Sequence, residues 1–137
     1  MYYIDTLTYH IVSFDFDPDN GEIYHPKTVI SVPTEHGAPD GMCIDEEGML
    51  WIAHWGGANV SRWNPDSGEL ITMVNVPALL VTSCCFGGKN LDTLYITSAR
   101  VDMSPDDMEK YPLSGSVFSF KPNVCGAKVN FFTPKPS

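Results

Sequence analysis

A repeat of 44 to 48 residues constrains this chain more than any other feature of its sequence. Ile4 and Ile52 stand 48 residues apart, and Ile52 and Ile96 stand 44 residues apart. Each copy alternates apolar and polar residues with period two, and no helical period fits it. The aligned segments are residues 3–5 with 11–22, residues 51–53 with 59–69 and, with a longer insertion, residues 95–97 with 116–123. A repeat of this length is typical of the four-stranded blade of a β-propeller.

The second copy contains all the strands of one blade. We expect its inner strand over residues 41–45, a turn at 46–48, and further strands over 50–53, 60–63 and 70–76. The third copy predicts strands over 83–86, 94–97 and 116–120. Eleven glycines and eleven prolines are spread along the chain, which suits short strands separated by turns. The sequence therefore predicts one all-β domain, a partial β-propeller, over residues 1–137.

The first copy begins at its second strand, so its inner strand would precede Met1. A propeller closes on itself to protect its strand edges, and about four blades is the fewest that does so. The chain carries about two and a half blades, and we expect the N-terminal blades of the propeller to be absent from it. It could be a fragment, a truncated product or half of an assembly. In the last case its open strand edges would self-associate with those of another chain.

The composition argues against several classes of partner. The formal net charge is −9, and the eight Lys and Arg residues form no basic stripe, so we expect neither nucleic acid nor membrane as a partner. No apolar stretch reaches the roughly 18 residues of a membrane span, and the start lacks the features of a signal peptide, which favours a cytoplasmic location. The cysteines follow no zinc spacing, and we expect Cys43, Cys84 and Cys85 to be small buried apolar residues.

Five stretches carry a resemblance to a known family. They are Tyr-Tyr-Ile-Asp-Thr at 2–6, Pro-Asp-Gly-Met-Cys-Ile-Asp at 39–45, Leu-Trp-Ile-Ala at 50–53, Thr-Ser-Cys-Cys-Phe-Gly-Gly-Lys-Asn at 82–90 and Tyr-Ile-Thr-Ser-Ala-Arg at 95–100. On these stretches the chain resembles the C-terminal half of the SMP-30/gluconolactonase/regucalcin family. The resemblance is collinear from Met1 to about Phe120 and is more specific than any single short motif.

The resemblance implies a six-bladed propeller that hydrolyses sugar lactones such as gluconolactone. It implies one bound divalent metal, Ca²⁺ or Zn²⁺, with Mn²⁺ or Mg²⁺ as further candidates. In the family the metal is held by a Glu, an Asn and an Asp, and only the Asp matches a residue of this chain, Asp40. The resemblance assigns Asp40 two roles, metal ligand and catalytic proton acceptor. The Glu, the Asn and the residues that hold substrate would lie upstream of Met1.

Local sequence leaves alternatives open for each candidate. Asp40 precedes a glycine and an apolar strand, so it could point into the channel or only stabilise a turn. Asp5, His54 and Thr82 are further candidates to face the channel; the alternatives are a turn or strand-end role for Asp5 and surface exposure for His54. Residues 100–113 form an insertion that could cover the channel mouth as a lid or be a plain surface loop.

Three functions are consistent with these features. The first is a metal-dependent sugar lactone hydrolase that uses Asp40. The second is a non-catalytic propeller fragment that binds partners through its open edges. The third is a regucalcin-like calcium-regulatory protein, which would have to bind calcium although the metal site is incomplete.

Overall fold

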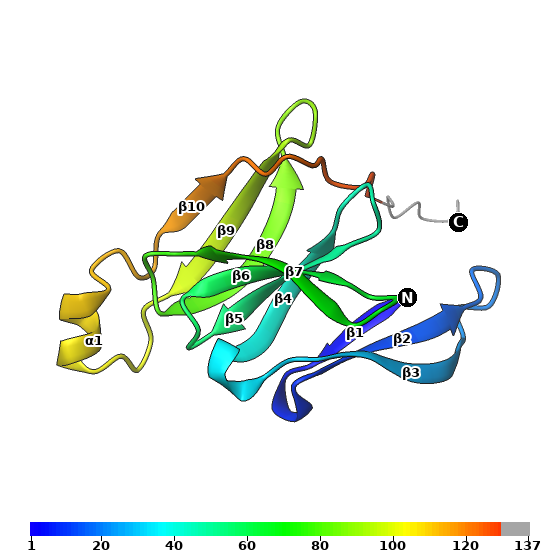
Figure 1. The fold of residues 1–137 in the computed structure, drawn as a ribbon, viewed down its shortest axis with the longest axis horizontal. Helices are drawn as coiled ribbons and strands as arrows, with labels where there is room; N and C mark the ends of the chain where they lie inside the picture. The colour runs from blue at the N-terminus through cyan, green and yellow to red at the C-terminus, as the bar shows by residue number, and fades with distance from the viewer. Residues whose placement is uncertain (130–137) are drawn as a thin grey trace, which may run out of the picture.

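The computed structural model describes residues 1–129, and its strands form three successive antiparallel units (Figure 1). The first unit consists of β1 (Tyr2–Asp5), β2 (His10–Phe16) and β3 (Ile23–Ser31). The second consists of β4 (Ala38–Ile44), β5 (Leu50–Trp55), β6 (Asn59–Asn64) and β7 (Glu69–Asn75). The third consists of β8 (Leu80–Gly87), β9 (Thr93–Ala99) and β10 (Val117–Phe120). Apart from β3, the strands lie where the repeat predicts them, so we call the three units blades one to three. We call β4 and β8, the first strands of blades two and three, inner strands.

Three short helices join these strands, and the sequence pattern had not indicated them. They are the 3₁₀-helices η1 (Thr6–Thr8) and η2 (Thr34–His36) and the α-helix α1 (Pro105–Lys110). Helix α1 lies in the insertion between β9 and β10, where the Ser104 side chain caps it by accepting from the Asp107 amide. The role of this insertion as a lid stays a prediction. Among the described residues no helix could span a membrane.

The middle blade is buried on both of its faces, because blades one and three pack against opposite sides of it. All residues from Leu50 to His54 on β5 are buried, in contrast to the exposed outer strand β7. One core joins blades one and two through Ile11, Ile30, Val32, Leu50, Ile52 and Trp63. The other joins blades two and three through Trp51, Ala53, Val60, Val76, Ala78, Val81, Cys84, Leu94 and Ile96. Successive residues of a strand point to opposite faces, so β5 supplies both cores in turn.

Blades two and three also share main-chain hydrogen bonds. Leu80 of β8 pairs with Trp55 of β5, and this pair joins the two blades into one curved sheet (Figure 1). Ala58, just before β6, extends the junction, because its amide donates to the carbonyl of Leu79, just before β8, at 3.1 Å. Since β4 also pairs with β5, the two inner strands β4 and β8 lie beside one another.

Five strands, β1, β3, β4, β7 and β10, each pair with a single other strand within residues 1–129. β1 pairs only with β2, and β10 pairs only with β9. In the middle blade β4 pairs with β5, and blade one has no such inner strand beside β1 among the described residues. Within residues 1–129 β1 and β10 each leave one edge unpaired, and the pairing of these edges with another chain stays a prediction.

Candidate active site

Asp40 lies on the inner strand β4 at an irregularity in the strand pairing. Pro39 pairs with His54 and Met42 pairs with Ile52, so the pairing of β4 with β5 is interrupted at Asp40 and Gly41. Such a bulge adds a residue to one strand and redirects the side chains beside it. Asp40 is thereby placed on the strand that the sequence predicts to line the channel.

Gly41 is needed at this bulge because the neighbouring inner strand comes very close. A Cβ atom at position 41 would lie 2.7 Å from the Cα of Ser83 on β8 and would collide with the Ser83 side chain. No flexible group could move aside to relieve the contact with the main chain. Gly41 therefore sets the spacing of β4 and β8 beside Asp40.

The Asp40 carboxylate is half-buried and stands without a hydrogen-bond or ion-pair partner among residues 1–129. Burial raises the pKa of Asp40 above its ordinary value of 3.8, because a desolvated carboxylate favours its neutral form. A raised pKa makes the carboxylate a stronger proton acceptor once it is ionised. This is the electrostatic setting that a general base requires.

The raised pKa of Asp40 leads to a prediction about stability. The folded chain binds the Asp40 proton more tightly than the unfolded chain, so ionisation of this carboxyl above pH 3.8 opposes folding. We expect Asp40→Asn to unfold at a higher temperature than the parent chain at pH 7, with the difference shrinking as the pH is lowered toward 4. Thermal denaturation across this range tests it, beside Asp66→Asn in the exposed β6–β7 turn, which should match the parent. A lower unfolding temperature for Asp40→Asn at pH 7 would contradict the argument.

Thr82 occupies the corresponding place on the other inner strand. The pairing of β8 with β9 shifts between Val81 and Ser83, so Thr82 also lies at a bulge. Its hydroxyl is 2.7 Å from the hydroxyl of Thr97 on β9. The bulges at Asp40 and Thr82 therefore fall on the adjacent inner strands β4 and β8.

Asp5 ends β1 and precedes η1, which lies against β4. The Asp5 side chain does not cap this helix, but its carbonyl accepts a hydrogen bond from the Thr8 hydroxyl at 3.2 Å. The described contacts thus give Asp5 a role at the end of a strand, which is the alternative that the sequence left open. A role in the channel stays a prediction.

His54 is fully buried, so the alternative of surface exposure is wrong. Its Nδ1 donates to the Gly37 carbonyl at 3.3 Å, which leaves Nε2 to accept from the Ser61 hydroxyl. Ser61 in turn accepts from the Trp63 indole at 2.6 Å. Burial lowers the pKa of His54 to about 4, and the neighbouring His36 adds to this effect against the opposing hydrogen bond to Gly37. His54 is therefore neutral at physiological pH and links β5 to β6 and to the residue after η2.

The cysteine prediction holds for one residue and fails for another. Cys84 is buried in the core between blades two and three, whereas Cys85 is exposed and Cys43 is half-buried. Adjacent residues on a strand point to opposite faces, so Cys84 and Cys85 could not both enter the core. The expectation of a buried Cys85 is wrong for this reason.

The residues present supply one part of a divalent-metal site. No group of three His, Cys, Asp or Glu side chains within residues 1–129 is arranged to hold a metal ion. Hard cations such as Ca²⁺ take about six to eight oxygen ligands, and the unpartnered Asp40 carboxylate could give one or two. The donor chemistry of Asp40 thus fits a hard cation, but the described residues alone do not complete its coordination.

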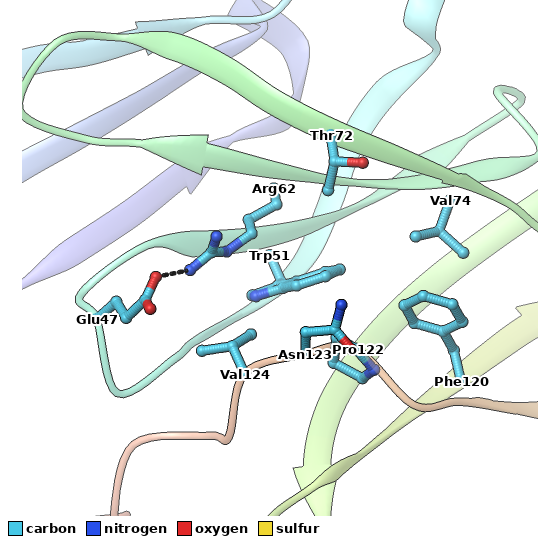
Figure 2. Close-up of a pocket in the computed structure, with 9 residues that line it drawn as sticks. All are labelled: Glu47, Trp51, Arg62, Thr72, Val74, Phe120, Pro122, Asn123 and Val124. Carbon is cyan, nitrogen blue, oxygen red and sulfur yellow. Dashed lines mark hydrogen bonds and ion pairs between the residues drawn. The ribbon is translucent and has the colours of Figure 1, made fainter.

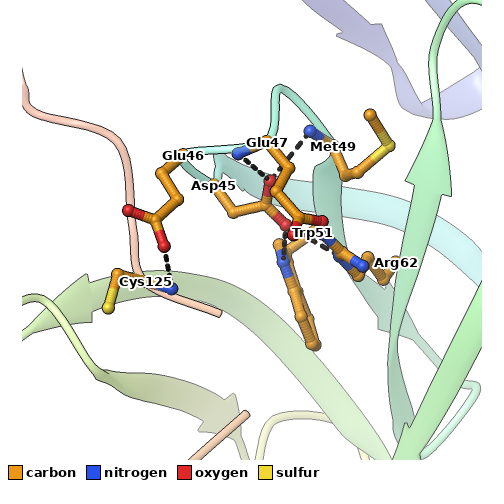
Figure 3. A network of polar contacts seen from close by, with 7 residues as sticks. All are labelled: Asp45, Glu46, Glu47, Met49, Trp51, Arg62 and Cys125. Atoms are coloured by element: carbon orange, nitrogen blue, oxygen red, sulfur yellow. Dashed lines mark hydrogen bonds and ion pairs between the residues drawn. The ribbon is translucent and has the colours of Figure 1, made fainter. Parts of the chain in front are cut away.

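A buried carboxylate network, which the sequence reading missed, lies at the end of β4 (Figure 3). Asp45 is 1% exposed, and its Oδ1 accepts from the amides of Glu47 and Met49, each at 3.0 Å. Its Oδ2 accepts from the Trp51 indole at 2.9 Å and from Arg62 Nε at 2.7 Å. The Asp-Glu-Glu-Gly turn was recognisable in the sequence, but its partners on β5 and β6 were not.

The same network borders a cavity between the middle blade and the segment after β10 (Figure 2). The cavity has a volume of about 260 Å³, and its lining includes Trp51, Arg62 and Phe120. The Arg62 guanidinium is already paired with Asp45 and, at 2.6 Å, with Glu47. Its charge is thus compensated, and the lining that residues 1–129 provide offers no unpaired cation for an anionic ligand.

Comparison with known proteins identifies the family. The family model for the SMP-30/gluconolactonase/LRE-like region matches residues 1–100. The chain belongs to this family. It is 43% identical to human regucalcin over 117 residues, which cover 85% of this chain and 39% of the relative. A Bacillus subtilis protein named as a sugar lactone lactonase, YvrE, is 44% identical over 119 residues, covering 87% and 41%.

Solved structures of the SMP-30/gluconolactonase/LRE-like family share the fold. A regucalcin from Agrobacterium tumefaciens, described as a calcium-binding protein, superposes with a TM-score of 0.84 and 29% identity over 92% of this chain and 43% of that one. A luciferin-regenerating enzyme gives a TM-score of 0.81 and 34% identity over 93% and 43%. These are propeller proteins, so the predicted β-propeller class and the predicted family are confirmed. The chain spans about two fifths of the length of the relatives that it matches.

Proposed function

We propose that the protein hydrolyses sugar lactones of the gluconolactone type, with Asp40 as the proton acceptor and as one ligand of a divalent cation. The observation that carries this proposal is the Asp40 carboxylate: it lies on an inner strand, is partly desolvated and has a raised pKa. Membership of the SMP-30/gluconolactonase/LRE-like family and the name of the Bacillus subtilis relative support the same chemistry.

Hydrolysis of a lactone needs an attacking water and a group that takes its proton. Water adds to the carbonyl carbon of the ring ester while Asp40 accepts a proton from it. The ring C–O bond then breaks, and the proton held by Asp40 can pass to the departing alkoxide, which gives the open hydroxy acid and restores the carboxylate. A bound Ca²⁺ or Zn²⁺, or Mn²⁺ or Mg²⁺ in their place, would polarise the lactone carbonyl. We place the protein in the cytoplasm, in keeping with its four free cysteines.

The remaining ligands of the cation would come from water and from polypeptide other than the described residues. The open edge of β1 is where blade one could accept an inner strand, and a second copy of the chain is one source of such a strand. This assembly belongs to the proposal, and size-exclusion chromatography with light scattering reports on it directly.

Metal dependence tests the proposed function. Gluconolactone hydrolysis is followed by acid release from the purified chain, then after EDTA treatment, and again after addition of Ca²⁺, Mn²⁺, Mg²⁺ or Zn²⁺. We expect EDTA to abolish turnover and at least one of these cations to restore it. Turnover that survives EDTA unchanged would contradict a cation-assisted mechanism.

A calcium-binding protein without turnover is the second candidate, favoured by the description of the Agrobacterium relative as calcium-binding. It predicts that Ca²⁺ raises the unfolding temperature of a chain that hydrolyses no lactone above background. The same samples therefore distinguish the two functions.

A further inference from the structure

Two thiols from neighbouring inner strands face each other in this structure. The Sγ atoms of Cys43 on β4 and Cys84 on β8 are 3.8 Å apart. We propose that Cys43 and Cys84 are an oxidation site, at which a hydroperoxide converts the two thiols into a reversible disulfide between blades two and three. None of the candidate chemistry at Asp40 uses these residues, so the proposal is independent of lactone hydrolysis.

The geometry requires only a small movement of the two side chains. A disulfide has an S–S distance of about 2.05 Å, so the sulfurs must approach by roughly 1.8 Å. The backbones of β4 and β8 already approach closely at Gly41 and Ser83, which lie two residues before Cys43 and directly before Cys84. Cys84 Sγ would give up its 3.4 Å hydrogen bond to the Trp51 carbonyl as it turns toward Cys43.

The two thiols differ in exposure, which suits a first reaction of one thiol with peroxide and a second reaction of the other thiol with the product. Cys43 is half-buried and lines a surface cavity of about 440 Å³, so a small peroxide can reach it. Cys84 is 4% exposed, and its hydrogen bond with Cys43 together with burial raises the pKa of the Cys84 thiol. Cys43 is therefore the attacking thiol, and Cys84 is the one that resolves the product.

The chemistry balances with hydrogen peroxide as the oxidant. The Cys43 thiolate attacks one peroxide oxygen, the O–O bond breaks, and a sulfenic acid and one water form once the departing hydroxide takes up the thiol proton. The Cys84 sulfur then attacks the sulfenic sulfur, the S–O bond breaks, and the disulfide and a second water form. The two cysteines lose two hydrogen atoms in total, and the peroxide is reduced to two waters.

Other cysteine pairs are placed less well. Cys84 and Cys85 are neighbours on β8 with side chains on opposite faces, one buried and one exposed. Cys125 lines a different cavity, beside Glu46 and Lys89. Because Cys85 is the most exposed of the thiols near Cys43, it provides the matched control.

Mass spectrometry of the native chain tests the proposal. The chain is treated with hydrogen peroxide, unfolded in the presence of an alkylating reagent, and digested with trypsin, which separates residues 28–62 with Cys43 from residues 63–89 with Cys84 and Cys85. We expect these two peptides to be linked, with a mass two hydrogens below their sum, and dithiothreitol to release them. The link should persist in Cys85→Ser, which leaves Cys84 as the only thiol in the second peptide, and disappear in Cys43→Ser.

Three outcomes would overturn the proposal. They are a link that disappears in Cys85→Ser, a link only between chains, and four thiols that all remain open to alkylation after peroxide treatment. The digest of the parent chain also excludes a bond between the neighbours Cys84 and Cys85 without relying on the folding of any variant, since that bond would leave the two peptides separate. Electrophoresis of the oxidised parent without reductant separates a link within one chain from a link between two chains.

Discussion

Asp45→Ala is expected to lower the free energy of unfolding by about 3–5 kcal/mol, because it leaves the buried Trp51 indole and two turn amides without their acceptor and removes one of the two carboxylates paired with Arg62. The Asp45 carboxylate takes four hydrogen bonds, two from the turn that follows it and two from Trp51 and Arg62. The Arg62 side chain is 13% exposed, so water cannot replace the lost partner fully. The same turn holds the segment after β10, since the Cys125 amide donates to the Glu46 carboxylate at 3.3 Å (Figure 3). The Glu46 amide also donates to the Cys125 carbonyl at 2.9 Å.

Urea denaturation followed by tryptophan fluorescence measures the effect of Asp45→Ala. The matched control is Glu47→Ala, which removes the other carboxylate paired with Arg62 but from a side chain that is 62% exposed. Exposed ion pairs contribute about 0–1 kcal/mol, so we expect the control to stay close to the parent. Equal losses in the free energy of unfolding from the two variants would contradict the expectation that burial makes the loss of Asp45 more costly.

The burial of His54 is expected to make the fold sensitive to mild acid. Its pKa is lowered from 6.5 to about 4 in the folded chain, so the unfolded chain binds the proton more readily. The contribution of neutral His54 to the free energy of unfolding is therefore complete above pH 6.5. It is lost as the pH falls toward 4, and the total loss is about 3 kcal/mol. About 2 kcal/mol of this should be lost between pH 7 and pH 5.

His54→Gln separates this effect from the titration of other groups. Glutamine keeps polar atoms near Gly37 and Ser61 but does not titrate, so its free energy of unfolding should fall less than that of the parent between pH 7 and pH 5. His25→Asn is the control, because the His25 side chain is 83% exposed. An unchanged pH dependence in His54→Gln would contradict the assignment of the acid sensitivity to His54.

The sequence predicted the blades well because their signal is local. The period-two pattern and the repeat offset located the described strands other than β3 to within a few residues, and β3 was not predicted. Helix α1 was missed because a six-residue helix in an insertion has no apolar periodicity to reveal it. Burial of Leu50 to His54 on both faces became clear only when blades one and three were seen to enclose β5.

The candidate site was predictable in part. Asp40 stood out through its motif, and its desolvation depends on the bulge and on the close approach of β8 at Gly41, which no local pattern encodes. Asp45 looked like an ordinary strand end, because its partners Trp51 and Arg62 come from two later strands. The contact of Cys43 with Cys84 spans 41 residues and was equally hidden.

The most direct test of the proposed function is the rate of gluconolactone hydrolysis by the parent chain and by Asp40→Asn, each with the cation that supports the highest parent rate. Asparagine keeps the size of the side chain but cannot accept the proton from water. We predict metal-dependent turnover in the parent and in the control Asp66→Asn, and a fall to background in Asp40→Asn while its unfolding temperature stays at or above that of the parent. Parent-like turnover in Asp40→Asn, or no turnover in a folded parent chain, would contradict the role of Asp40.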